Sequence, residues 1–169
     1  WLLEKNFASK VITSFSLSDK GVHASIMRFA SSTYLAQTLS SDKTKVLNVI
    51  NSLSQSQGGT RMDLGLKDSG KELTGPNSRT NSTKVLILFT DGQPDSGTDP
   101  VSIAQALKNQ GIIIYTVGVG TGVDPVILRK IASQPPETHA FLADSFTKLQ
   151  QLLNSLIQAT CKGDTCATD

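Results

Sequence analysis

The sequence predicts an α/β fold: a doubly wound, mostly parallel sheet with one antiparallel edge strand and helices on both faces. A continuous apolar run at residues 85–89 is typical of a strand buried on both faces of a parallel sheet, and residues 112–119, which open with the apolar run 112–115, form a second such strand. Each run is followed by a helical pattern, over 101–107 and from Asp124-Pro125 onward. Strands that alternate with helices build one sheet with helices on both sides, joined by right-handed crossovers.

The N-terminal part predicts a helix followed by a hairpin. Apolar residues recur at near-helical spacing, so the chain opens in an amphipathic helix carrying Leu2, Leu3, Phe7, Val11, Ile12 and Phe15. Residues 19–21 form a turn. Residues 22–29 alternate as a half-buried strand, and a short turn leads into a second strand over 33–38, which pairs with the first as a hairpin.

Two helices follow the hairpin. The first has a buried stripe made of Val46, Leu47, Val49, Ile50 and Leu53. Either Ser41 or Asp42 is its N-cap, since both residue types accept hydrogen bonds from the first turn. A Gly-Gly pair then breaks the pattern, and the second helix runs from Met62 to about Leu73. Residues 75–83 carry no apolar side chain and form a loop.

The C-terminal part completes the alternation. Asp124 and Pro125 start a helix, with Asp at the cap and Pro in the first turn. A short strand is expected over 138–142, and a last amphipathic helix over 146–157. We assign residues 1–160 to one domain and residues 161–169 to a tail that carries both cysteines.

Composition excludes two classes of partner. The 169 residues are 38% hydrophobic and 18% charged, which is ordinary for a globular domain. The net charge is +2 and the basic residues are scattered, so no nucleic acid is expected as a partner. No apolar stretch approaches the roughly 20 residues that span a bilayer.

Three residues indicate an extracellular, secreted or cell-surface setting. Cys161 and Cys166 are the only cysteines, and they follow the last helical pattern. Asn81 begins an N-glycosylation sequon, Asn-Ser-Thr, within a polar loop. Cysteines at a domain end together with a sequon favour an oxidising compartment, whereas the alternative is a cytosolic chain with two incidental thiols.

The candidate chemistry lies in two loops. Asp91 directly follows the buried run at 85–89, and Thr60 follows a Gly-Gly pair just before a helix. Ligands of open α/β sheets bind at the carboxyl ends of the strands. Carboxylate, hydroxyl and water oxygens suit a hard cation such as Mg²⁺. The alternatives are that Asp91 only forms an Asp-Gly turn and that Thr60 only caps the next helix.

Four motifs in this order resemble the von Willebrand factor A family. They are Gly58-Gly59-Thr60, the strand ending in Phe89-Thr90-Asp91-Gly92, the strand 113–120, and the strand-to-helix turn 141–146. The opening helix and hairpin also follow the family's order. The resemblance covers essentially the whole chain as far as Cys161.

The resemblance implies a metal-ion-dependent adhesion site built from three loops. Thr60 matches the family's threonine and Asp91 matches its aspartate. The first loop, Asp-x-Ser-x-Ser, and the central strand before it have no counterpart in this sequence, so we expect both upstream of Trp1. A sheet without that strand would expose two inner edges. The implied cofactor is Mg²⁺, or Mn²⁺ or Ca²⁺.

The resemblance also implies a function in adhesion. We expect a module of a larger multidomain protein that binds an acidic side chain of an extracellular matrix protein, such as a collagen, through the metal. The alternative is an interaction scaffold of the same family that binds partners without a working metal site. Family members often tie their termini together, so Cys161 pairs either with Cys166 or with a cysteine upstream of Trp1.

No catalytic constellation is present, and we expect no enzyme. Residues 65–72 mimic a phosphate-binding loop, but they lie in a predicted helix and end in Glu where Ser or Thr is required. Neither His23 nor His139 has a partner at metal-ligand spacing, so both are expected to be structural. Asp63 and Asp95 lie near the two site loops and are expected to be solvated surface residues, the alternative being that they tune the charge of the site.

Overall fold

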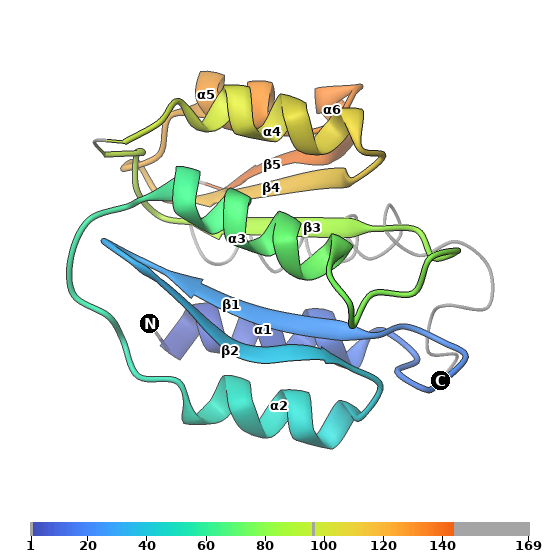
Figure 1. Cartoon of the computed structure of the whole chain (residues 1–169). Coiled ribbons are helices and arrows are strands. Elements are labelled where there is room, and N and C mark those ends of the chain that lie inside the picture. Colours follow the sequence, from blue (N-terminus) through green and yellow to red (C-terminus); the bar gives the residue numbers. More distant parts are fainter. Residues whose placement is uncertain (1, 96, 144–169) are drawn as a thin grey trace.

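The chain adopts an α/β fold in a computed structural model that describes residues 2–95 and 97–143 (Figure 1). The elements in chain order are α1 (Leu2–Thr13), β1 (Ala24–Phe29), β2 (Thr33–Ser40), α2 (Lys43–Ser52), α3 (Met62–Thr74), β3 (Val85–Thr90), α4 (Pro100–Asn109), β4 (Ile113–Val119), α5 (Pro125–Ile131), α6 (Pro136–His139) and β5 (Ala140–Ala143). The helix predicted over 146–157 and both cysteines lie outside the described residues.

Strands β3, β4 and β5 form a parallel sheet in that order. Val85 lies opposite Ile113 and Thr90 opposite Gly118, so β3 and β4 end level with each other. Continuous apolar strands suit this position because helices cover both faces. The sequence prediction of two buried parallel strands is confirmed, and their carboxyl ends share one edge.

Strands β1 and β2 form the predicted antiparallel hairpin, with Phe29 opposite Thr33 next to the turn. The first strand begins at Ala24 rather than at residue 22, because Val22 makes only an isolated bridge with Leu17. The pairing register shifts between Ala24 and Met27. Such irregularities bend a strand and increase its twist.

The described residues form two sheets rather than the single sheet that the sequence predicts. Among them, β1 pairs with β2 alone and β3 pairs with β4 alone. Helix α3 contacts both β1 and β3, and so it connects the two sheets on one side (Figure 1).

Helices pack on both faces of the parallel sheet. On one face, Leu88 and Ile114 pack against Met62 and Leu66 of α3. On the opposite face, the strands pack against α1, where the Phe7 and Phe89 ring centroids lie 5.1 Å apart. Burial of these side chains on both faces is the main stabilising contribution, at about 25 cal/mol per Å² of apolar surface.

Aspartates cap three of the described helices, and two of these caps were expected from the sequence. Asp42, rather than Ser41, caps α2, because its side chain accepts from the Lys45 N–H. Asp124 caps α5, and Asp99 caps α4. Each cap removes unsatisfied N–H groups from a first turn.

The last described strand differs from its prediction. Residues 138 and 139 belong to the short helix α6, and β5 begins at Ala140 instead of residue 138. His139 stacks on Tyr115, with ring centroids 4.7 Å apart. Its structural role is therefore the one expected.

The hairpin is fastened to the segment that leads into α3. The Gly59 N–H donates to Ser31 Oγ at 2.8 Å, and the Arg61 N–H donates to the Ala30 carbonyl at 2.9 Å. Gly58 has a φ of 130°, and a Cβ added there would lie 2.4 Å from Ser31 Oγ. Only glycine tolerates both the conformation and the close approach.

Candidate metal site at the carboxyl edge of the sheet

Both predicted site residues lie at the carboxyl edge of the parallel sheet. Asp91 immediately follows β3, and Thr60 lies two residues before α3 begins at Met62. The Asp91 side chain is exposed to solvent and Thr60 is partly exposed. The two loops therefore meet where ligands of open α/β sheets bind.

Glycines allow the loops to approach each other closely. A Cβ added to Gly92 would lie 3.0 Å from Thr60 Oγ1, so the threonine hydroxyl lies directly against the residue that follows Asp91. A Cβ on Gly122 would lie 2.6 Å from the Asp91 carbonyl oxygen. Larger side chains at these positions would push the loops apart.

Thr60 does not cap the following helix. The N-cap of α3 is Arg61, and no side chain makes a capping hydrogen bond there. The backbone of Thr60 is engaged, since its carbonyl accepts from Met62 N–H and Asp95 N–H. Its hydroxyl has no hydrogen-bond partner among the described residues, which leaves that oxygen available for a ligand.

Glu4 is a site residue that the sequence reasoning missed. Its half-buried carboxyl group lies close enough to the Asp91 carboxyl group for the two to interact. Burial, and then the negative charge of Asp91, raise the pKa of Glu4 above its usual value. A signal was present, because Glu4 occupies the same helical stripe as Phe7 and Val11, where an acidic residue is unusual.

The oxygen donors suit a hard divalent cation held in an open shell. They are one hydroxyl and two carboxyl groups, which match the preferences of Mg²⁺ or Mn²⁺. In residues 2–95 and 97–143, no three His, Cys, Asp or Glu side chains gather around a common point. The described residues therefore do not surround a cation completely. They are compatible with a solvent-exposed site that is completed by further ligands.

The prediction that Asp63 is a solvated surface residue is wrong. Its side chain is buried, with a relative exposure of 4%, and it forms an ion pair of 2.7 Å with Arg61. This hydrogen bond from Arg61 holds the pKa of Asp63 far below its usual value. The sequence offered a signal in the Arg-x-Asp spacing, but burial depends on the loop that covers it.

The remaining predicted residues lie apart from this edge. Asn81 is exposed in the loop between α3 and β3. Residues 65–72 lie inside α3, so the phosphate-loop interpretation is excluded by their helical structure. Among the described residues, no helix is long and apolar enough to cross a membrane.

Comparison with known proteins assigns the family. The sequence profile of the von Willebrand factor type A domain matches residues 1–155. The chain belongs to the von Willebrand factor type A domain family. This assignment confirms the resemblance drawn from the four motifs, and it covers both candidate loops.

The chain resembles single segments of much longer members of this domain family. It is 30% identical to the collagen alpha-4(VI) chain of Mus musculus over 163 residues, which are 93% of this chain and 7% of that protein. It is 31% identical to cochlin of Homo sapiens, covering 92% of this chain and 28% of cochlin. For matrilin-1 of Gallus gallus the identity is 30%, over 97% of this chain and 34% of matrilin-1.

Solved structures confirm the von Willebrand factor A fold. Proximal thread matrix protein 1 from the mussel byssus, solved with a zinc-occupied metal-ion-dependent adhesion motif, superposes with a TM-score of 0.83 and 27% identity. The match covers 98% of this chain and 41% of that one. The Plasmodium vivax TRAP protein superposes with a TM-score of 0.77 at 23% identity over 97% of this chain and 66% of TRAP, a likeness of fold.

Proposed function

We propose that this domain is an extracellular matrix-binding module that holds a divalent cation at Thr60 and Asp91. The cation, Mg²⁺ or Mn²⁺, supplies an open coordination position to which an acidic side chain of a protein ligand binds. In the family, an Asp-x-Ser-x-Ser loop supplies the remaining protein ligands. The domain acts by binding and not as an enzyme.

One observation supports the cation site above all others. The Thr60 hydroxyl, which has no hydrogen-bond partner in the described part of the chain, lies against the turn that carries Asp91, and Gly92 provides the space for this approach. A hydroxyl and a carboxylate brought together by glycine, at the ligand-binding edge of the sheet, are a donor set for a hard cation. The zinc-occupied motif of the mussel thread protein is a further supporting observation.

The proposed setting is the extracellular matrix. By their names, relatives include a collagen VI chain and a byssal thread matrix protein. The exposed sequon at Asn81 is accessible for N-glycosylation. Cys161 and Cys166 are proposed disulfide cysteines, and collagen-like matrix proteins are the proposed ligands. The chain spans only 7% to 34% of the collagen VI, cochlin and matrilin-1 relatives, so any partner of the whole protein is likewise proposed.

Substitution of Asp91 tests the metal site. Binding of Mn²⁺, measured by electron paramagnetic resonance, and Mg²⁺-dependent adhesion to immobilised collagen are compared in the wild type and in Asp91→Ala and Thr60→Ala variants. We expect Asp91→Ala to abolish the cation-dependent part of both signals, because it removes the charged ligand. Asp99→Ala, in the same loop, removes a helix cap instead and is the matched control.

The outcome also separates the two functions considered for this family member. Equal collagen binding by wild type and Asp91→Ala, both in Mg²⁺ and in chelator, would mean that the domain is a scaffold without a working metal site. The measurement is made on the 169-residue chain.

A further inference from the structure

We propose that Asp95 and Asp63 are positioning residues that lock the Thr60 segment against the loop after β3 before any ligand arrives. The proposal rests on the cation site proposed above. Neither residue is a ligand in it. Together they fix the separation between the Thr60 hydroxyl and the Asp91 carboxylate.

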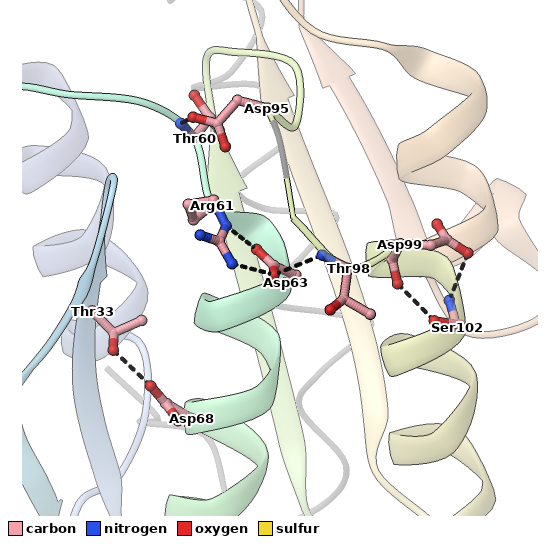
Figure 2. Close-up of polar contacts among 9 residues, drawn as sticks. All are labelled: Thr33, Thr60, Arg61, Asp63, Asp68, Asp95, Thr98, Asp99 and Ser102. Carbon is pink, nitrogen blue, oxygen red and sulfur yellow. Dashed lines mark hydrogen bonds and ion pairs between the residues drawn. The ribbon is translucent and has the colours of Figure 1, made fainter.

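Asp95 makes a two-point contact with Thr60. The Thr60 N–H donates to Asp95 Oδ2 at 2.8 Å, and the Asp95 N–H donates to the Thr60 carbonyl at 3.2 Å (Figure 2). The first bond uses a carboxylate and is therefore stronger than a bond between neutral groups. Two bonds between the same two residues fix their relative orientation as well as their distance.

Gly59 makes this contact with Asp95 possible. A Cβ added to Gly59 would lie 1.6 Å from Asp95 Oδ2, so any other residue would displace the carboxylate. The glycine pair at 58–59 thus has two separate tasks. Gly58 adopts the conformation that the turn requires, and Gly59 leaves space for the side chain that holds Thr60.

Asp63 holds the other end of the same loop. Its carboxylate accepts two hydrogen bonds from the Arg61 guanidinium, at 2.8 and 2.7 Å, and one from the Thr98 N–H at 3.0 Å (Figure 2). Gly97 has a φ of 146°, and a Cβ there would lie 2.6 Å from Asp63 Oδ2. Asp63 is buried, so this anchor is shielded from solvent.

Each of the two connected segments contributes one of these carboxylates. Asp95 reaches from the loop to the Thr60 segment, whereas Asp63 reaches from α3 back to the loop at Thr98. The loop that begins at Asp91 is therefore attached to the α3 segment at two points. Groups that orient the ligands of a cation typically change its affinity by about 10- to 100-fold when they are removed.

Asp95 is the residue to substitute, because it is exposed and its loss leaves the core intact. We expect Asp95→Ala to weaken Mn²⁺ binding about 10-fold and to accelerate hydrogen exchange of the Thr60 amide, measured by NMR. Asp95→Asn keeps an acceptor oxygen and should restore the slow exchange, with intermediate affinity because a nearby charge is lost. Asp68→Ala removes a carboxylate of α3 that accepts a hydrogen bond from Thr33 instead. It should change neither the Mn²⁺ affinity nor the exchange of the Thr60 amide.

Failure of this proposal differs from failure of the cation site. If the wild type does not bind Mn²⁺, or Asp91→Ala binds it equally well, the cation site is wrong and the positioning role falls with it. If Asp91→Ala loses binding while Asp95→Ala retains wild-type affinity, only the positioning role is overturned. Unchanged exchange of the Thr60 amide in Asp95→Ala also overturns it, without any cation present.

Discussion

At the scale of single residues, two buried or half-buried carboxyl groups at this edge have opposite environments. Asp63 accepts three hydrogen bonds, which stabilise its charged form. Glu4 lies beside Asp91 and is partly desolvated, which destabilises its charged form. The two residues should therefore affect stability in opposite directions as the pH changes.

Asp63→Asn tests the first environment. The pKa of Asp63 is lower in the folded state than in the unfolded state. The ionised carboxylate therefore stabilises the fold at any pH above the pKa of an unfolded aspartate, which is about 4. This stabilisation is lost as the pH falls through the pKa of the folded state. At pH 7 we expect a loss of about 1 to 3 kcal/mol in the free energy of unfolding, measured with urea. The loss should shrink below about pH 4.

The matched substitution for Asp63 is Asp68→Asn on the same helix. Asp68 pairs with Lys71, whose side chain is 67% exposed, so its removal should cost less than about 1 kcal/mol. Equal losses for the two variants at pH 7 would contradict the special role of the buried pair.

Glu4→Gln tests the second environment. The pKa of Glu4 is raised, so its contribution to stability is fully present below the pKa of an unfolded glutamate and is lost as the pH rises through the folded-state value. We expect the variant to be more stable than the wild type at pH 7, by less than about 1 kcal/mol. The two proteins should become equal in acid, as measured by thermal unfolding.

The exposed residue Glu137 provides the comparison for Glu4. Glu137→Gln should leave the melting temperature unchanged at both pH values. A Glu4→Gln variant that is less stable than the wild type at pH 7 would show that the Glu4 carboxylate is satisfied by its surroundings.

At the scale of elements, the end of β4 is packed without spare room. Gly118 lies opposite Thr90 at the carboxyl edge and is buried. A Cβ there would lie 2.5 Å from Leu128 Cδ1 of α5 and 3.1 Å from Leu142 Cδ2 of β5. The absence of a side chain at this position therefore allows α5 and β5 to close over the strand end.

Gly118→Ala should destabilise the domain by about 1 to 3 kcal/mol, because overfilling a packed core forces neighbouring side chains to move. The free energy of unfolding is compared in Gly118→Ala, Leu128→Ala and the double variant. If Leu128 is the obstacle, adding Gly118→Ala to Leu128→Ala should cost less than adding it to the wild type. Strict additivity of the two changes would show that the predicted collision does not occur.

At the scale of the whole molecule, helices connect the two sheets. Helix α1 contributes Phe7 and Val11 to the cluster under β3 and β4, and Ile12 to a second cluster with Val46 and Ile50 of α2. Helix α3 makes the corresponding connection on the other side, where it packs against both β1 and β3. We therefore expect the two sheets to unfold together.

Phe7→Ala tests this coupling. Removal of a buried aromatic side chain should lower the free energy of unfolding by about 3 to 5 kcal/mol. Because α1 connects both sheets, we expect amide hydrogen exchange to accelerate together in β1 and β4. Faster exchange in β4 alone would mean that the hairpin and the parallel sheet unfold separately. The milder Phe7→Leu variant gives the same comparison if Phe7→Ala does not fold.

The parts of this structure that the sequence predicted are those that depend on local pattern. A continuous apolar run identified β3, a largely apolar segment identified β4, and side-chain chemistry identified the caps at Asp42 and Asp124. Thr60 and Asp91 were found because each follows or precedes a recognisable element at the carboxyl edge. Their roles as metal ligands remain predictions.

The parts that the sequence did not predict depend on contacts between distant segments. Glu4 reaches Asp91, and Asp95 reaches Thr60, only after the elements have packed. The sequence predicts Asp63 at the surface because no residue close to it in the chain indicates that residues 97–98 cover it. Short elements such as α6 carry too few residues for a periodic pattern to be recognised.

The attachment of the hairpin turn to the Thr60 segment has a mechanical consequence. A module embedded in a matrix experiences tension. The Gly59 and Arg61 N–H groups join their backbone to the hairpin turn by donating hydrogen bonds to Ser31 Oγ and to the Ala30 carbonyl. A load applied to the β1–β2 turn would therefore reach the candidate cation ligand through two short hydrogen bonds, without passing through the core. Under the proposed function, ligand binding should accordingly depend on the direction in which the domain is pulled.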